Sequence, residues 1–428
     1  MKKIKLTTWI FLAMLAGIGV GWMCHELLPT PESAKTVASY ISLFTDVFLR
    51  LIKMIIAPLV FSTLVVGIAH MGDTKSIGRI GIKTMAWFIT ASLFSLLLGL
   101  LLVDTLRPGD SLNLPLPDVG ASTNLKTASL SLKEFVTHLV PRSIVESMAN
   151  NEILQIVVFS VFFGAAAASF GSKAQVVIDS IEQLSHVMLK LTGFVMALAP
   201  FAVFAAMASI VTTQGLGILW VYGKFMGQFY LGILLLWGLL AVAGFLFLGP
   251  RVGRLISLIR EPILLAFSTA SSEAAYPKTL EQLERFGASK KITSFVLPLG
   301  YSFNLDGSMM YCTFATLFIA QAYKIDLDLT QQITMLLILM VTSKGMAGVP
   351  RASLVVIAAT LATFNIPEAG LLLIMGIDQF LDMGRSATNV VGNSMATAVV
   401  AKWEGELEPE AQAQAEIDAD EGIEPARA

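Results

Sequence analysis

Apolar runs long enough to cross a bilayer recur along the chain, separated by short polar or charged segments. The hydrocarbon core of a bilayer is about 30 Å thick, so a spanning helix needs about 20 apolar residues. Runs of this length favour helices, which satisfy all their backbone hydrogen bonds inside lipid. The pattern predicts helices over residues 8–24, 37–68, 83–106, 153–170, 184–211 and 219–248, with a shorter one near 135–148.

The apolar segments after residue 260 are interrupted by small and polar residues. Residues 255–283 are split at 267–277, and residues 331–363 are split at 342–351. Each segment predicts two short helices that enter the bilayer and return on the same side. Paired interrupted segments indicate inverted repeats with a binding site near the bilayer midplane. Irregular backbone at that depth is tolerated only where it is buried in protein or lines a cavity.

Each interrupted segment is followed by a longer apolar run, 292–323 and then 371–402, and the first of these is broken at 304–308. The last run carries polar residues at steps of four, three, four and four, which places them on one helix face. They are Asp378, Asp382, Arg385, Asn389 and Asn393, with Ser386 beside the arginine.

The polar face of the last run has two interpretations. Ionisable side chains at membrane depth are costly, and they face a protein interior or a polar cavity. The face could supply hydrogen bonds between packed helices. An arginine between two carboxylates favours a binding site instead.

The composition supports a membrane protein and excludes several other classes. Of 428 residues, 55% are hydrophobic and 14% are charged, whereas soluble domains carry about 25% charged residues. The net charge of -2 favours neither a nucleic-acid partner nor a polybasic lipid-binding surface. The two cysteines and four histidines show no disulfide framework or metal-ligand spacing, and no enzyme motif is present. We predict an all-α polytopic membrane protein that is not an enzyme and needs no cofactor.

Basic residues predict the orientation of the chain, because cytoplasmic loops are enriched in lysine and arginine. They cluster at 2–5, 75–83 and 251–260, whereas the polar loop at 107–135 has few for its length. We expect both termini in the cytoplasm and a first helix that is retained rather than cleaved as a signal peptide. The acidic segment 404–428 is expected to be disordered.

Four motifs, in order along the chain, resemble those of the dicarboxylate/amino acid:cation symporters, the glutamate transporter family. Within that family the chain is most similar to the bacterial proton/glutamate–aspartate symporters. The resemblance covers nearly the whole chain. The motifs are Ser271-Ser272-Glu273, Asn304-Leu305-Asp306-Gly307-Ser308, Ala347-Gly348-Val349-Pro350 and the segment from Asp382 to Asn389.

The resemblance implies eight transmembrane helices plus two re-entrant hairpins, a homotrimer in the bacterial inner membrane, and an elevator mechanism. In that mechanism a transport domain slides against a fixed scaffold. The scaffold would comprise residues 1–82 with helices one and two, and residues 136–215 with helices four and five. The transport domain would comprise residues 83–135, with helix three and an extracellular loop, and residues 216–403. The cytoplasmic tail would follow from residue 404.

The resemblance also implies roles for individual site residues. Arg385 would hold the side-chain carboxylate of the substrate, for which a planar guanidinium is well matched. A salt bridge from Arg385 to Asp382 or Asp378 is the alternative, and the two states could alternate. Asp382 would bind an ammonium group, which favours an α-amino dicarboxylate over succinate or malate. The other substrate-binding candidates are Ser271, Ser272, Ser308, Val349, Ser353, Ser386 and Asn389.

Cation coupling is where the chain departs from the sodium-driven members. Gly300, Asn304, Asp306 and Asn389 match positions that supply oxygen ligands to sodium in those members. Asn393 stands where they have an aspartate, and Lys344 stands where they have a neutral residue. Losing an acid and gaining a fixed cation both weaken sodium binding.

These departures lead to the hypothesis of proton coupling, with sodium as the alternative coupling ion. Glu273 is the leading proton carrier, because a glutamate near an apolar gate should have a raised pKa. Alternatively, Glu273 pairs with a nearby cation. Arg351 follows the proline of the second hairpin, where relatives have a small residue. It would either pair with Glu273 across the hairpin tips or meet the substrate directly, as part of a gate.

The sequence therefore predicts a proton-driven symporter of L-glutamate and L-aspartate. A C4-dicarboxylate symporter and a sodium-coupled acidic amino acid symporter are the alternatives within transport. An anion channel lined by Arg385 is disfavoured, because a channel does not need two gated hairpins.

Overall fold

The computed structural model describes residues 6–69, 74–110, 116–117, 137, 139–217, 222–343 and 352–409. Regular structure in these ranges is helical, apart from one antiparallel bridge between Ala288 and Leu407. Among the described residues, five helical stretches are long and apolar enough to cross a membrane. They are Thr8–Leu27, Pro31–Ala69, Ser76–Leu106, Ile153–Met196 and Gly223–Leu248.

The first three helices were expected, and each is longer than its apolar run. They are α1 (Leu6–Leu27), α2 (Pro31–Ala69) and α3 (Thr74–Leu106). The early start of α3 follows from its charged first turns. Arg79 and Lys83 both form ion pairs with Glu404, at 2.7 Å and 2.6 Å, so this part of the helix packs against the end of the chain.

The prediction of one helix over residues 184–211 is wrong, because the structure divides this stretch into two helices. It lies across α7 (Gln175–Met196) and α8 (Ala199–Gln214), with the break at residues 197–198. Pro200 falls in the first turn of α8, where its missing N–H is tolerated, whereas a continuous helix would lose a hydrogen bond there. Before α7 come α5 (Ile144–Ala149), α6 (Ile153–Phe170) and the 3₁₀ turn η1 (Gly171–Ala174).

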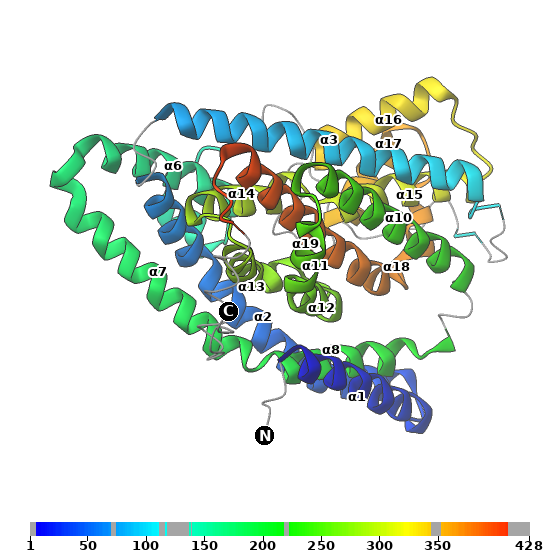
Figure 1. Ribbon diagram of the computed structural model, residues 1–428. Coiled ribbons are helices and arrows are strands. Elements are labelled where there is room, and N and C mark those ends of the chain that lie inside the picture. Colours follow the sequence, from blue (N-terminus) through cyan, green and yellow to red (C-terminus); the bar gives the residue numbers. More distant parts are fainter. Residues whose placement is uncertain are drawn as a thin grey trace.

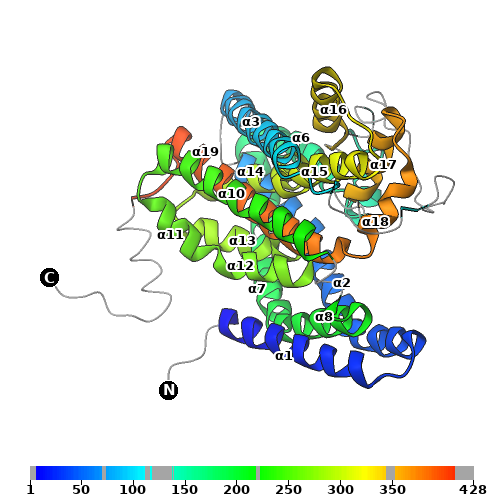
Figure 2. The same cartoon turned by 90° about the vertical axis from the view of Figure 1, so that its right-hand side faces the viewer.

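Helices α1, α2, α6, α7 and α8 form one group, in which α8 packs along α1 and α2, and α2 also packs along α6 and α7. Both views show α1 and α8 side by side below the rest of the molecule (Figures 1 and 2). Two glycines allow this approach. A Cβ on Gly17 would lie 2.5 Å from the carbonyl oxygen of Phe204, and one on Gly21 would lie 2.6 Å from that of Ala208.

A second group of helices packs around the last long helix, α19 (Asp378–Glu404), and includes α3 and α10 (Gly223–Leu248). The short α11 (Arg251–Leu258) leads from α10 into this group. The predicted helix over 371–402 is also corrected. Its first part forms η3 (Glu368–Leu371) and α18 (Leu372–Met375), and α19 begins only at Asp378. The chain bends where the polar face begins, and the Asp378 carboxylate at this bend contacts both Arg385 of its own helix and Tyr311 of a neighbouring helix.

The first interrupted segment forms the pair α12 (Arg260–Thr269) and α13 (Ser272–Arg285). The break is narrower than the predicted 267–277, because the local residues cap both helices tightly. Ala270 takes a left-handed conformation with φ of 49°, and the Ser271 side chain accepts a hydrogen bond from the N–H of Ala274 at 3.2 Å.

The remaining helices follow the predicted interruptions. The chain breaks at residues 304–305, between α14 (Lys290–Phe303) and α15 (Asp306–Ala322). The second interrupted segment gives α16 (Leu329–Thr342) and α17 (Ala352–Thr363), and the turn between them lies outside the described residues.

The end of the described chain forms a clasp, residues 402–409, that holds α19 against its neighbours. The N–H of Ser289 donates to the carbonyl oxygen of Glu406 at 3.0 Å, and the N–H of Glu408 donates to that of Gly287 at 2.9 Å. Lys291 forms an ion pair with Glu406. The first residues of the predicted tail are thus packed onto the loop between α13 and α14.

Candidate functional site

The predicted polar face of α19 forms a buried ionic cluster. The Arg385 side chain is only 1% exposed, and its Nη2 lies 3.1 Å from Oδ1 of both Asp378 and Asp382. The two acids differ in environment, since the Asp378 side chain is 3% exposed and that of Asp382 is 30% exposed. The arginine is therefore paired internally, and Asp382 is the acid that a solute can reach.

Tyr311 of α15 completes this cluster and was not predicted from the sequence. The guanidinium carbon of Arg385 lies 4.1 Å from the centre of the Tyr311 ring, which is a cation–π contact. The Tyr311 hydroxyl donates to Oδ1 of Asp378 at 3.1 Å. Its position three residues after Ser308, on the same helix face, is the signal that could have identified it.

The cluster leaves hydrogen-bonding capacity on the arginine. Nε and Nη1 of Arg385 are buried and make no hydrogen bond within the described part of the chain. Buried donors without partners cost free energy, and a charged group costs more than a neutral one. Two guanidinium nitrogens of Arg385 therefore remain without a hydrogen-bond acceptor among the described residues.

The N-terminus of α15 is joined to α19 beside this cluster. The side chain of Asn389 accepts a hydrogen bond from the N–H of Gly307 at 3.0 Å and donates to Oγ of Ser308 at 3.3 Å. The Ser386 hydroxyl donates to Oδ1 of Asp382 at 3.4 Å. The structure thus brings together Arg385 and four predicted substrate-binding residues.

Close backbone approach at this junction requires glycine. A Cβ on Gly307 would lie 2.6 Å from the carbonyl oxygen of Arg385, and one on Gly392 would collide with the Asp306 carboxylate. The glycines thus allow α15 to start directly against the polar face of α19.

Three of the four residues predicted to match sodium ligands, Gly300, Asn304 and Asp306, lie with Asn393 in a second buried cluster, one turn along α19. Nδ2 of Asn304 donates to Oδ2 of Asp306 at 3.1 Å and to Oδ1 of Asn393 at 3.2 Å. From α3, the Ser95 hydroxyl donates to Oδ1 of Asp306 at 3.3 Å. A Cβ on Gly300 would collide with Oδ1 of Asn393.

The oxygens of this second cluster bear on cation binding. Asp306 is its one carboxylate, and the side-chain oxygen of Asn393 already accepts a hydrogen bond from Asn304, whereas Oδ1 of Asn304 is buried and has no hydrogen-bond partner among the described residues. The described residues contain no group of three or more His, Cys, Asp or Glu side chains placed to hold a metal ion. A hard cation prefers several oxygen ligands with more negative charge.

Asn393→Asp tests this interpretation. The new carboxylate would lie in the same cluster as that of Asp306, and two buried like charges are unfavourable until a cation binds between them. We expect substrate uptake by the variant to become stimulated about tenfold by sodium, measured as initial uptake rates with and without sodium. Asn393→Ala is the control and should gain no sodium stimulation. Equal sodium responses in the two variants would contradict the interpretation.

The first hairpin places its predicted residues at the start of α13. Ser271 caps the helix, and Ser272 and Glu273 lie half-buried in its first turn. Both α12 and α13 pack against α19. The first-turn N–H groups of α13 thus belong to the same helix group as Arg385.

Three predicted residues of the second hairpin, Lys344, Val349 and Arg351, lie outside the described residues. Ser353, at the start of α17, is buried. Its carbonyl oxygen accepts a weak hydrogen bond from the thiol of Cys312, with the sulfur at 3.9 Å. Cys312 follows Tyr311 on α15, so α17 contacts the helix that supports the arginine.

The profile described as the sodium:dicarboxylate symporter family matches residues 6–403. The chain belongs to this family. It is 39% identical over 422 residues to the proton/sodium-glutamate symport protein of Bacillus subtilis (strain 168), covering 96% of this chain and 95% of that protein. The protein of that name from Bacillus caldotenax is 41% identical, covering 96% and 97%. The C4-dicarboxylate transport protein of Laribacter hongkongensis (strain HLHK9) is 40% identical, covering 95% and 92%.

Family membership confirms the predicted resemblance. This member of the sodium:dicarboxylate symporter family is a multi-pass membrane protein and a secondary symporter of small acidic solutes, not an enzyme. The names of its relatives divide between glutamate and C4-dicarboxylate, and those of the glutamate symporters include a cation.

Proposed function

We propose that the protein is a proton-coupled symporter that imports L-glutamate and L-aspartate across the bacterial inner membrane. The observation that supports this most is the environment of Asp382. Asp378 is enclosed by Tyr311 and Arg385, whereas Asp382 lies beside the same arginine and stays partly exposed. An exposed carboxylate next to a buried guanidinium is suited to a solute that carries both an ammonium group and a carboxylate.

In this proposal each charged group of the solute has a partner in the site. The free donors of Arg385 would bind the side-chain carboxylate, and Asp382 would bind the ammonium group. Ser308, Ser386 and Asn389 would complete the polar shell. At the tip of the first hairpin, Ser271, Ser272 and the first N–H groups of α13 would bind the α-carboxylate, as helix N-termini bind anions.

Proton coupling is supported by the Asn304–Asn393 hydrogen bond, which occupies an oxygen that a sodium ion would need. Glu273, half-buried in the first turn of α13, would carry the proton. Sodium coupling is the alternative, consistent with relatives whose names include both cations.

The transport cycle would use an elevator movement of the α19 group against the α2 group. In this arrangement eight spanning helices and two re-entrant hairpins, α12–α13 and α16–α17, form each protomer, with both termini in the cytoplasm. A homotrimer would be held through the scaffold. Exposed large apolar side chains on α2, among them Tyr40, Leu43 and Phe44, are available for contact with lipid or another protomer.

A substrate panel tests the proposed function. Counterflow of radiolabelled L-aspartate into proteoliposomes should be competed strongly by L-glutamate and weakly by succinate. C4-dicarboxylate transport is the second candidate, favoured by relatives of that name. Stronger competition by succinate than by L-glutamate would support it and contradict our proposal.

A further inference from the structure

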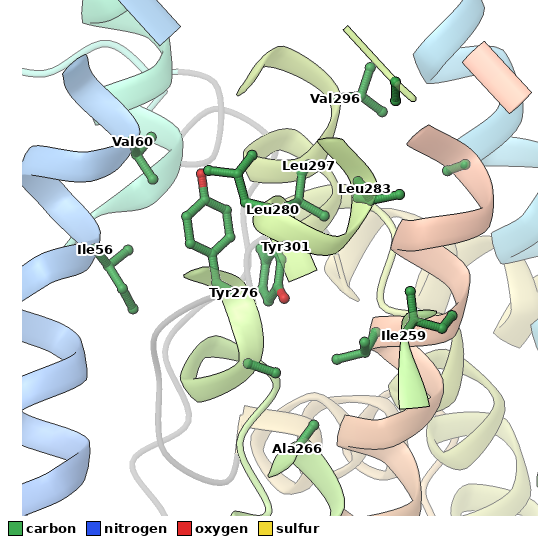
Figure 3. Packing of buried hydrophobic residues seen from close by; sticks show 14 of the residues in the cluster. Ile56, Val60, Ile259, Ala266, Tyr276, Leu280, Leu283, Val296, Leu297 and Tyr301 are labelled. Carbon is green, nitrogen blue, oxygen red and sulfur yellow. The ribbon is translucent and has the colours of Figure 1, made fainter. Parts of the chain in front are cut away.

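The two helix groups meet along a seam between α2 and the pair α13–α14. Figure 3 shows Ile56 and Val60 of α2 facing Tyr276 and Leu280 of α13. These side chains are 0–3% exposed and belong to one hydrophobic cluster. An apolar seam of this kind can slide without breaking directional bonds.

A cavity of about 210 Å³ lies at one end of the seam, next to the loop between α13 and α14. Both helix groups line it, including Thr63 and Gly67 from α2, Glu182 and His186 from α7, and Glu284 and Lys290 from the α13–α14 side. The cavity can hold water molecules, each of which takes about 30 Å³ in the liquid. The hydroxyl oxygen of Ser289, also in the lining, is buried and makes no hydrogen bond with described residues, so water there would have a partner.

The seam is tight directly beside the cavity. A Cβ on Gly67 would lie 2.5 Å from the hydroxyl oxygen of Ser294, so α2 and α14 are in close backbone contact here. Ser294 itself is 2% exposed. Any separation of the two groups would therefore expose Ser294 and open the cavity further to water.

Glu284 is the acidic residue that the second group contributes to this cavity. It lies in the last turn of α13, outside the long spanning helices. Burial raises the pKa of the Glu284 carboxyl to about 7, although Lys290 and a hydrogen bond with Thr293 act in the opposite direction. Burial prevails because it disfavours the charged form of the carboxyl, and the negative charge of Glu281 acts in the same direction.

Other titratable groups line the cavity from α14 and α7. Helix α14 contributes Lys290 and Lys291, and the latter is paired with Glu406. Helix α7 contributes Glu182 and His186, whereas α2 contributes no titratable side chain to the lining. On α13 itself, Glu281 lies one turn before Glu284 and forms ion pairs with Lys278 and Arg285.

We propose that Glu284 is a proton-dependent latch, with its carboxyl protonated while the seam is closed and ionised when the seam opens. This inference rests on the proposed elevator movement. On opening, the O–H bond of the carboxylic acid breaks, the proton passes to water in the cavity, and the carboxylate becomes hydrated. Closing the seam reverses the transfer. The latch is separate from the substrate site and adds a proton-linked step to the movement of the domain.

The sign of the pH dependence follows from linkage. The closed seam binds the Glu284 proton with a pKa of about 7, whereas the open seam should have the ordinary value near 4.5. Between these values opening releases one proton, so the ratio of open to closed protein should rise about tenfold per pH unit. Below and above this pH window, titration of Glu284 should no longer change the ratio of open to closed protein.

The test measures seam opening in the full-length protein in detergent by thiol labelling of Ser294→Cys. An exposed reference, Lys173→Cys, corrects for titration of the thiol itself, and the background carries Cys24→Ser. The labelling ratio of the two sites should rise about tenfold per unit from pH 5 to 7 and then level off. In the Glu284→Gln background the ratio should be independent of pH. The variant Glu281→Gln on the same helix keeps the Glu284 carboxyl but removes a neighbouring negative charge that raises its pKa, so the pH dependence should remain and level off at lower pH than in the parent.

Three outcomes would overturn the latch. The pH dependence could persist in Glu284→Gln, it could disappear in His186→Gln instead, or Ser294→Cys could remain unlabelled at every pH. Each can occur while the protein still exchanges L-aspartate in proteoliposomes, so failure of the latch is distinct from failure of the proposed function. Loss of exchange in the unmodified protein would instead contradict the proposed function.

Discussion

Replacing Arg385 with alanine is expected to abolish the uptake of acidic substrates. The change removes the donor proposed for the substrate carboxylate and leaves Asp378 and Asp382 facing each other without a cation. Truncating one partner of a buried, hydrogen-bonded charge pair with a ligand costs about 2–5 kcal/mol, which corresponds to at least about thirtyfold in affinity. Initial rates of L-aspartate uptake and equilibrium binding by calorimetry would both show the loss.

The control for Arg385→Ala must separate binding from folding. Lys402→Gln, in the last turn of the same helix, should leave uptake within about twofold, since an exposed charge contributes little. The double variant Arg385→Ala/Asp378→Asn removes one unpaired acid and should recover thermal stability without recovering binding. Measurable L-aspartate binding by a folded Arg385→Ala protein would contradict the assigned role.

Asp382→Asn is expected to separate amino acids from dicarboxylates. The ammonium group of L-aspartate would lose its ionic partner, at a cost of about 2–5 kcal/mol, so its affinity should fall at least about thirtyfold. Succinate has no ammonium group and should bind about as well as before, or better, because the neighbouring negative charge is gone. Inhibition constants for L-aspartate and succinate, measured on the same preparation, give the comparison.

Ser386→Ala is the matched control for Asp382→Asn. Its hydroxyl donates to the same carboxylate at 3.4 Å, so its removal perturbs Asp382 without removing the charge. We expect a change of less than about fivefold for either ligand, the value of one ordinary hydrogen bond. If Asp382→Asn weakened both ligands equally, the acid would have a structural role, and the assignment to amino acids would be wrong.

The polar face of α19 could be predicted because helical spacing alone places Asp378, Asp382 and Arg385 together. The structure finds their ion pairs within one helix, where sequence separation and distance are directly related. The interruption at residues 304–305 could also be predicted from the sequence, since Asn304 and Gly307 disfavour a continuous apolar helix.

Contacts between helices were less accessible to sequence reasoning. Tyr311 looks like any aromatic residue in an apolar run, and only the packing of α15 on α19 places it against Arg385. The division between α7 and α8 depends on one proline, which is tolerated in a first turn and disruptive in a helix interior.

The contacts of the clasp at the end of the chain could not be predicted from the sequence either. An acidic segment with little apolar content predicts disorder. Its first residues are nevertheless held by Arg79, Lys83 and Lys291, whose partners are far away in the sequence. Periodicity carries no information about such pairings. The cavity around Glu284 is also invisible to sequence reasoning, because it exists only where the two helix groups meet.

Uptake of L-aspartate into proteoliposomes under an imposed proton gradient, with sodium excluded on both sides, tests the central claim most directly. We expect L-aspartate to accumulate inside above its external concentration, and a protonophore to abolish this accumulation. Imposing a sodium gradient at equal pH should not increase it further. A strict sodium requirement would contradict the coupling inferred from Asn304 and Asn393. The absence of accumulation under either gradient, by protein shown to be folded, would contradict symport of acidic amino acids itself.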